Sequence, residues 1–283
     1  MSPHTRASLA ADAAALGLGD GNIVMMHAAF SRVGPVLGGP DALVDAVLDV
    51  VGPSGTVVSY QDWDVGVDIW NADGSVQESL RAHVPPYDPA TSRPARDHGI
   101  LASTIRSRSG VHTSANPGAA MSAWGFRADE LTRDHPMDDG YGASTPLARI
   151  VASGGMVLMV GAPLDTMTVL HHAEAIADIP DKRRVRIEYP LRGDDGSTVW
   201  RWVEEFDTSR PIVDGLDDDY FASVVEDFLA TGSGRRGTIG DADSVLVDAR
   251  EITAFAVDWL TRRSQLLATT TSRMPAPRGT GPQ

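Results

Sequence analysis

The chain has 283 residues, of which 42% are hydrophobic and 22% charged, a composition that can fill a hydrophobic core and is not that of a disordered protein. Its formal net charge of −14 argues against nucleic acid and anionic membranes as partners, because phosphate-rich surfaces require clustered Lys and Arg, and here 24 basic residues are scattered among 38 acidic ones. The absence of cysteine excludes disulfides, thiolate metal sites and a cysteine nucleophile.

The first part of the chain predicts helices alternating with buried strands. Apolar residues at helical spacing predict a helix over 5–17, and continuous apolar runs at 22–30 and 56–61 are typical of strands buried on both faces. Between these strands, Pro40 and Asp41 open a helix that ends near Val51, since proline is tolerated in a first helical turn.

Residues 62–98 are rich in Asp, Trp, Pro and Gly and have little periodicity, which indicates a long functional loop or lid. Beyond it we expect, in order, a helix over 99–110, a buried strand over 156–163, a hairpin over 184–206 around the turn "GDDG", and helices over 217–231 and 248–264. The predicted fold class is α/β: mixed αβ layers with a central, partly parallel sheet flanked by helices. No linker is evident, so we expect one domain over residues 1–267, followed by a disordered polar tail over 268–283.

The N-terminus lacks the basic start and apolar core of a secretory signal. No apolar run approaches the ~20 residues that span a bilayer. We therefore expect a cytoplasmic protein with no membrane partner.

The segment "DTMTVLHHAEAIADIP" carries the clearest candidate chemistry. On a helix, residues i and i+3 share a face, so His171 and Glu174 point the same way, while His172 is rotated by roughly 100°. A carboxylate beside a histidine can hold the tautomer that leaves the other ring nitrogen free to accept a proton, and it stabilises the imidazolium that forms. Asp165 and Thr168 lie just upstream, where a strand passes into a helix and ligands collect in α/β sheets.

Two other interpretations of His171 and Glu174 remain open from these residues alone. They could be an ordinary pair on a solvated face, or His-x-x-Glu could supply two ligands to a divalent metal. The second interpretation needs further ligands from distant positions such as His27 or Asp165. We predict no metal.

Several segments together resemble one family. "MMHAAFSRVGPVLGGPDAL", "DHPMDDGYGASTPLARI", "GGMVLMVGAPLDTMTVLHHAE" and "VEEFDT", together with the stretch over 87–125, follow the order and spacing of the aminoglycoside 3-N-acetyltransferases over roughly residues 5–262. The resemblance implies a mixed αβ fold unrelated to the common N-acetyltransferase superfamily. It also implies acetyl transfer from acetyl-coenzyme A to the 3-amino group of a 2-deoxystreptamine aminoglycoside, which confers resistance.

The resemblance also implies roles for particular residues. His171 aligns with the family's base, Glu174 with its acidic partner and Thr168 with its threonine. Because no cysteine is available for an acyl-enzyme, we expect the amine to attack the thioester directly. The glycine-containing loop after the first strand and the segment "TSANPG" are candidates for binding acetyl-coenzyme A, although the loop could be a plain connection; the candidate residues are Phe30, Ser31, Arg32, Gly34, Val36 and Ser114. Ala28 and Ala29 replace the two serines usual in the family, which removes two possible hydroxyl contacts.

A cationic sugar calls for carboxylates in the cleft. Acidity could serve solubility alone, but a cleft lined by acids concentrates cations. The candidates for binding the aminoglycoside are Asp62, Trp63, Asp64, Asp88, Asp165 and Asp207. Two other functions stay open, a non-catalytic acidic protein that binds cationic amino sugars and a metal-dependent hydrolase, and a homodimer is possible.

Overall fold

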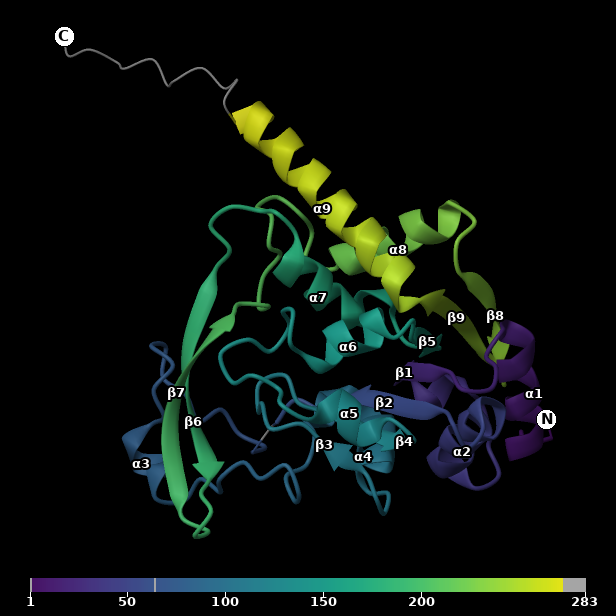
Figure 1. Ribbon diagram of the computed structural model, residues 1–283, viewed down its shortest axis with the longest axis horizontal. Coiled ribbons are helices and arrows are strands. Elements are labelled where there is room, and N and C mark those ends of the chain that lie inside the picture. The colour runs from purple at the N-terminus through teal and green to yellow at the C-terminus, as the bar shows by residue number, and fades with distance from the viewer. Residues whose placement is uncertain (1, 64, 272–283) are drawn as a thin grey trace.

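The computed structural model describes residues 2–63 and 65–271, and its centre is a seven-stranded sheet (Figure 1). In spatial order the strands are β3 (His112–Thr113), β4 (Met121–Gly125), β2 (Thr56–Tyr60), β1 (Ile23–Ala28), β5 (Met156–Val160), β9 (Ala242–Asp248) and β8 (Arg235–Ile239). Strand β1 pairs in parallel with β2 and β5, and the outer strands pair antiparallel. The predicted α/β class with a partly parallel sheet is confirmed.

Helices cover both faces of this sheet. One face is covered by α1 (Arg6–Leu16), α2 (Gly39–Val51) and α4 (Gly99–Arg106), and the other by α5 (Ala128–Thr132), α6 (Pro146–Ala152), α7 (Val169–Ile176), α8 (Tyr220–Ala230) and α9 (Ala249–Thr271). The central strand shows how the two cores arise: Met25 packs with the α7 side, and Val24 and Met26 pack with the α1 side. Alternate side chains of a strand leave opposite faces, so a strand covered on both sides must be apolar throughout.

A two-stranded hairpin stands apart from the main sheet, on the left in Figure 1. It consists of β6 (Arg184–Arg192) and β7 (Thr198–Phe206), paired antiparallel as the alternating pattern predicts. The segment over 62–98 packs against it through a third apolar cluster, which includes Trp63, Tyr87 and Tyr189. Apart from Asp64, which lies outside the described residues, this segment has only short regular elements, α3 (Glu78–Arg81) and the 3₁₀ turn η2 (Arg96–His98).

The structure differs from the sequence-based expectations in several places. The helix expected over 99–110 ends at Arg106, because the chain turns there toward the edge strand. Strands β3, β4 and β8 and helices α5 and α6 are short and were not predicted, and strand β9 was missed because its apolar run directly precedes a helix in the sequence. Helix α9 was expected to end near residue 264 and continues to Thr271, so residues 268–271, expected in the tail, are helical, and the rest of the expected tail lies outside the described residues.

Across residues 2–63 and 65–271, no helix is both long and apolar enough to cross a bilayer. The same part contains no group of three His, Cys, Asp or Glu side chains placed to hold a metal ion.

Candidate active site

A cavity of about 570 Å³ opens where β1 and β5 end. Its wall is built from the ends of β1 and β2, the start of α4, and the turn from β5 into α7. The polar and aromatic side chains of this wall include His27, Tyr60, His98, Asp165, Thr168 and His171. Ligands bind at the carboxyl ends of parallel strands because the connections to the helices diverge there. Three residues of the predicted site, Asp165, Thr168 and His171, lie in the wall of this cavity.

Helix α7 carries His171 and Glu174, the predicted base and its acidic partner. Thr168 precedes the helix, lines the cavity and is nearly buried. The Nδ1 atom of His171 lies 2.6 Å from Oε2 of Glu174. The other carboxylate oxygen, Oε1, accepts a hydrogen bond from the hydroxyl group of Tyr220, the first residue of α8.

The hydrogen bond between His171 and Glu174 has a defined direction. A carboxylate only accepts hydrogen bonds, so Nδ1 of His171 is the donor and Nε2 carries the basic lone pair. The imidazole lines the cavity and contacts the rings of Tyr141 and Phe221, with centroids 5.2 and 4.8 Å away. His172 turns away, as the helical period predicts, and its Nδ1 donates to the carbonyl oxygen of Tyr141 over 2.7 Å.

The predicted sugar-binding acids are divided among different environments. Asp165 is exposed and lines both the main cavity and an adjoining one of about 110 Å³, which also includes Asp218. Asp62 and Trp63 line a neighbouring cavity of about 510 Å³, and Asp62 lies 3.7 Å from the imidazole of His98.

Two of the predicted acids have structural contacts instead. Asp88 accepts hydrogen bonds from the backbone N–H of Ala90 and the hydroxyl of Thr91, and it lies 3.5 Å from Arg192. Asp207 caps the turn at Ser209. Burial raises its pKa, but the hydrogen bonds from Ser209 and the nearby charge of Arg183 together outweigh burial, and the pKa is lowered. We therefore leave Asp88 and Asp207 out of the sugar site proposed below.

The candidate coenzyme residues are similarly divided. Ser31 is exposed, and Arg32 donates to the carbonyl oxygen of Gly161 over 2.8 Å at the edge of a cavity of about 610 Å³. Phe30, Gly34 and Val36 lie half-buried along the same connection.

Ser114 lies in the interior, apart from this loop. It accepts a hydrogen bond from the backbone N–H of Met121 and, because Nε2 of His135 donates to the carbonyl oxygen of Gly140, it donates to Nδ1 of that imidazole. Its hydrogen-bonding capacity is used inside the fold, so we do not retain Ser114 in the proposed coenzyme site.

Several residues of the site carried no local signal in the sequence. Tyr220 lies 46 positions from Glu174, and only the packing of α8 against α7 and α9 brings them together. His27 was considered only as a remote metal ligand; it lines the cavity, and burial together with the nearby His98 lowers its pKa to about 4. A histidine at the end of a buried strand is the one hint that the sequence contained.

Fold and site together define an α/β protein in which a histidine, held by a buried carboxylate, faces a cavity at the ends of parallel strands. The family model of aminoglycoside 3-N-acetyltransferases matches residues 25–261. The chain belongs to the aminoglycoside 3-N-acetyltransferase family and is an acyltransferase.

Similar proteins of this family span most of the chain. Aminoglycoside N(3)-acetyltransferase III of Pseudomonas aeruginosa is 44% identical over 92% of this chain and 95% of its own length. The structure of AAC-IIIb in binary complex with CoASH is 55% identical and superposes with a TM-score of 0.90 over 93% of this chain and 98% of that one. AAC-VIa bound to sisomicin is 33% identical, with a TM-score of 0.87 over 93% of this chain and 99% of that one.

Proposed function

We propose that this enzyme transfers the acetyl group of acetyl-coenzyme A to the 3-amino group of a 2-deoxystreptamine aminoglycoside, and so confers resistance to it. The observation that carries the proposal is the 2.6 Å contact between Nδ1 of His171 and Glu174 in the cavity wall. The names and ligands of the relatives support the two substrates.

The reaction begins with removal of a proton. A protonated amine has no lone pair for attack, so Nε2 of His171 first takes a proton from the ammonium group, and the imidazolium is stabilised by the carboxylate of Glu174. The amine nitrogen then attacks the thioester carbonyl carbon. The C–S bond breaks and an amide forms as the nitrogen loses its second proton. The leaving thiolate takes up that proton to become free coenzyme A, and the imidazolium returns its own proton to solvent.

The surroundings of the base suit the two substrates. Asp165 borders both His171 and the adjoining cavity that contains Asp218, where two carboxylates can attract the other ammonium groups of the sugar. Asp62 and Trp63 extend the polar and aromatic wall on the far side of His98. Arg32 lines the neighbouring 610 Å³ cavity and is suited to a phosphate of acetyl-coenzyme A, whereas Arg236 on the same wall is paired with Glu226.

A thiol-release assay with acetyl-coenzyme A and a panel of aminoglycosides tests the proposal. We expect turnover by the wild type, with the product acetylated at N3 by NMR. His171→Ala should lower kcat on the order of 10²–10⁴-fold while sugar binding, measured by calorimetry, stays within a factor of a few. His83→Ala, on the exposed surface, is the control and should behave as wild type.

Two results would contradict this function. An acetyl group found at another position would reject the assignment of the 3-amino group. Sugar binding by the wild type without any thiol release, with binding weakened in His171→Ala, would favour a non-catalytic binding protein.

A further inference from the structure

The residue that fixes the catalytic carboxylate lies on a different helix from the pair. Glu174 is 2% exposed, and its two oxygens have separate partners: Oε2 meets Nδ1 of His171, and Oε1 accepts the hydroxyl proton of Tyr220. A buried carboxylate needs such partners because its lone pairs are cut off from water.

Tyr220 is itself held firmly. It is the first residue of α8, it is buried, and its ring stacks on Trp259 of α9 with centroids 6.1 Å apart and planes 15° apart. The edge of its ring also meets Phe221, the next residue, which in turn contacts the imidazole of His171. The hydroxyl therefore reaches Glu174 from a fixed direction, and the line Tyr220–Glu174–His171 runs from the core to the cavity.

The chemistry of the phenol makes the direction of this hydrogen bond definite. Burial, followed by the charge of Glu174, raises the pKa of Tyr220, so the hydroxyl keeps its proton and is the donor. A hydrogen bond donated to a carboxylate favours its charged form. The charged form is the one that orients Nδ1–H and stabilises the imidazolium.

We propose that Tyr220 is a positioning residue of the acetyl transfer, whose hydroxyl group fixes the plane and the charge of Glu174 and through it the orientation of the His171 base. This inference rests on the proposed function of His171 as the base. Tyr220 transfers no proton in the reaction; it keeps its own throughout.

Tyr220→Phe removes one oxygen atom and tests the proposal. We expect kcat to fall roughly 10- to 100-fold, the range seen when a group that orients a catalytic ligand is lost, with the KM values of both substrates within about twofold of wild type. Without the donated hydrogen bond the buried carboxylate binds a proton more readily, so the acidic limb of the kcat/KM profile should move to higher pH. A protonated Glu174 no longer stabilises the imidazolium, so the titration of the His171 ring, followed by ¹⁵N NMR without substrate, should move to lower pH.

Tyr87→Phe is the matched control. Its hydroxyl is also buried and donates to one acceptor, the carbonyl oxygen of Ser114, but it lies in the cluster beneath the hairpin. The Tyr87→Phe variant should have lower thermal stability than wild type, with an unchanged kcat and an unchanged pH profile. If Tyr220→Phe also changes only stability, with kcat and the acidic limb as in wild type, the positioning role is rejected.

A nearly isosteric change covers the case in which Tyr220→Phe fails to fold. Placing 3,5-difluorotyrosine at position 220 makes the phenol a stronger donor, so the acidic limb should move to lower pH, opposite to the effect of Phe. If the acidic limb of the kcat/KM profile stays where it is in wild type, the positioning role of Tyr220 is rejected. Wild-type turnover tests the proposed function separately, because a wild type inactive on every aminoglycoside would overturn that function, while the NMR titration would still decide the role of Tyr220.

Discussion

His171 and Glu174 differ sharply in exposure: the imidazole side chain is 25% exposed and the carboxylate 3%. The difference suits their proposed roles, because a base must reach its substrate and an orienting acid works best where water cannot compete for its oxygens. The sequence predicted that the two share a helix face. Which of them faced the cavity depended on how α7 packs against α8 and α9.

Glu174→Gln tests the charge at this position. A neutral amide can still accept from Nδ1 of His171, but it cannot stabilise an imidazolium. We expect kcat to fall on the order of 10²–10⁴-fold in the thiol-release assay, with little change in KM.

The control for this variant is Glu188→Gln. Glu188 is also a buried carboxylate, but its partner is Arg81, at 2.7 Å, beside the hairpin. Loss of the negative charge that pairs with Arg81 should lower the melting temperature and leave kcat unchanged. Equal loss of activity in both variants would mean that damage to the fold, and not the charge at 174, is responsible.

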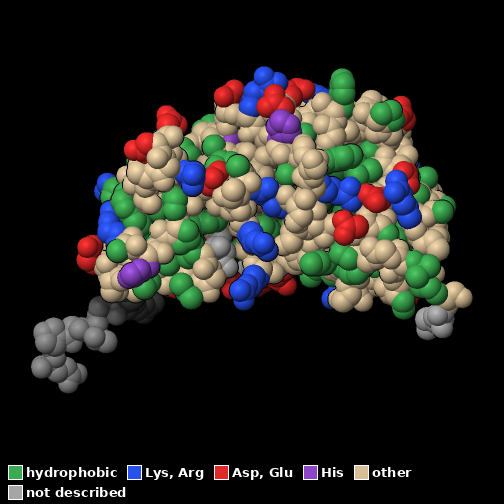
Figure 2. Space-filling view, turned by 90° about the horizontal axis from the view of Figure 1, so that it is seen from below, with side chains coloured by type: hydrophobic (Ala, Val, Ile, Leu, Met, Phe, Trp, Pro, Cys, Tyr) green, Lys and Arg blue, Asp and Glu red, His purple; other side chains and the backbone are tan. Residues whose placement is uncertain are grey.

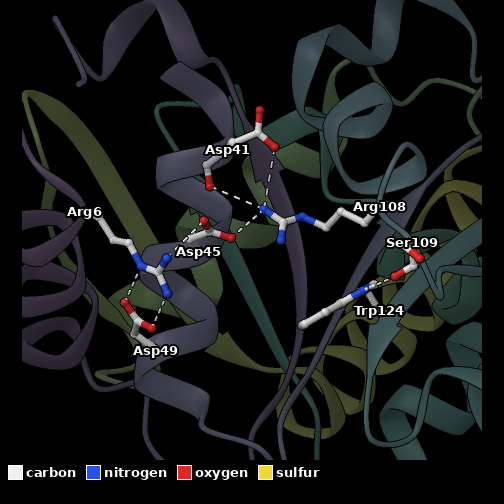
Figure 3. Close-up of polar contacts among 7 residues, drawn as sticks. All are labelled: Arg6, Asp41, Asp45, Asp49, Arg108, Ser109 and Trp124. Atoms are coloured by element: carbon white, nitrogen blue, oxygen red, sulfur yellow. Dashed lines mark hydrogen bonds and ion pairs between the residues drawn. The ribbon is translucent and has the colours of Figure 1, made fainter. Parts of the chain in front are cut away.

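At the scale of elements, helix α2 is tied to its neighbours by a row of acids at every fourth position (Figure 3). Arg6 of α1 donates to Asp49 and Asp45, and Arg108, just after α4, donates to Asp45 over 2.6 Å. Residues four apart lie on one helix face, so two arginines from different segments can share the row. These contacts join α1, α2 and α4 on the face of the sheet opposite α7.

Arg108 should matter more than Arg6. Its side chain is 17% exposed against 50%, and its guanidinium lies over the ring of Trp124. We expect Arg108→Ala to lower the free energy of unfolding by about 1–2 kcal/mol in urea titrations, since a charged hydrogen bond and aliphatic packing are both lost. Arg6→Ala is the comparison and should cost less, because water and salt screen an exposed pair. A larger effect for Arg6 would contradict this ranking.

At the scale of the whole molecule, the net charge of −14 does not show where a ligand of either sign binds. The face in Figure 2 carries both signs, with Lys and Arg side chains gathered near its middle. The local arrangement of charges therefore decides where each ligand binds: Asp165 and Asp218 near His171 form the proposed site for a cation, and Arg32 lies in the proposed site for an anion.

The stability of the fold should depend on pH through its buried imidazoles. Burial lowers the pKa of His27 and of His135 to about 4 and also lowers that of His172. The unfolded chain therefore binds more protons than the folded one between about pH 6.5 and 4, so stability is complete above pH 6.5 and is lost as pH falls toward 4. His27 and His135 each contribute on the order of 3 kcal/mol at neutral pH. Burial raises the pKa of Glu205, which acts in the opposite sense but is a single group.

Urea titrations at pH 7.5, 6 and 5 measure this dependence. We expect the midpoint to fall at each step, and His83→Gln, a change at an exposed histidine, to leave the trend unaltered. A midpoint constant from pH 7.5 to 5 would show that the buried imidazoles do not govern acid stability.

The sequence by itself determined the features that follow from local periodicity. Continuous apolar runs marked β1, β2 and β5, alternation marked the β6–β7 hairpin, and the helical period placed His171 and Glu174 on one face with His172 turned away. These features need only the geometry of a strand or a helix. The registered segments were enough to indicate the family, which the comparisons confirmed.

Tertiary structure alone decided which distant groups meet. It brought Tyr220 to Glu174, placed Asp165 beside the base, and used Asp88, Asp207 and Ser114 in internal hydrogen bonds. The physical reason is that a polar side chain takes whichever partner the folded backbone brings within about 3 Å, and that partner can lie anywhere in the chain. Local sequence shows what a residue can do, and packing decides which neighbour it does it with.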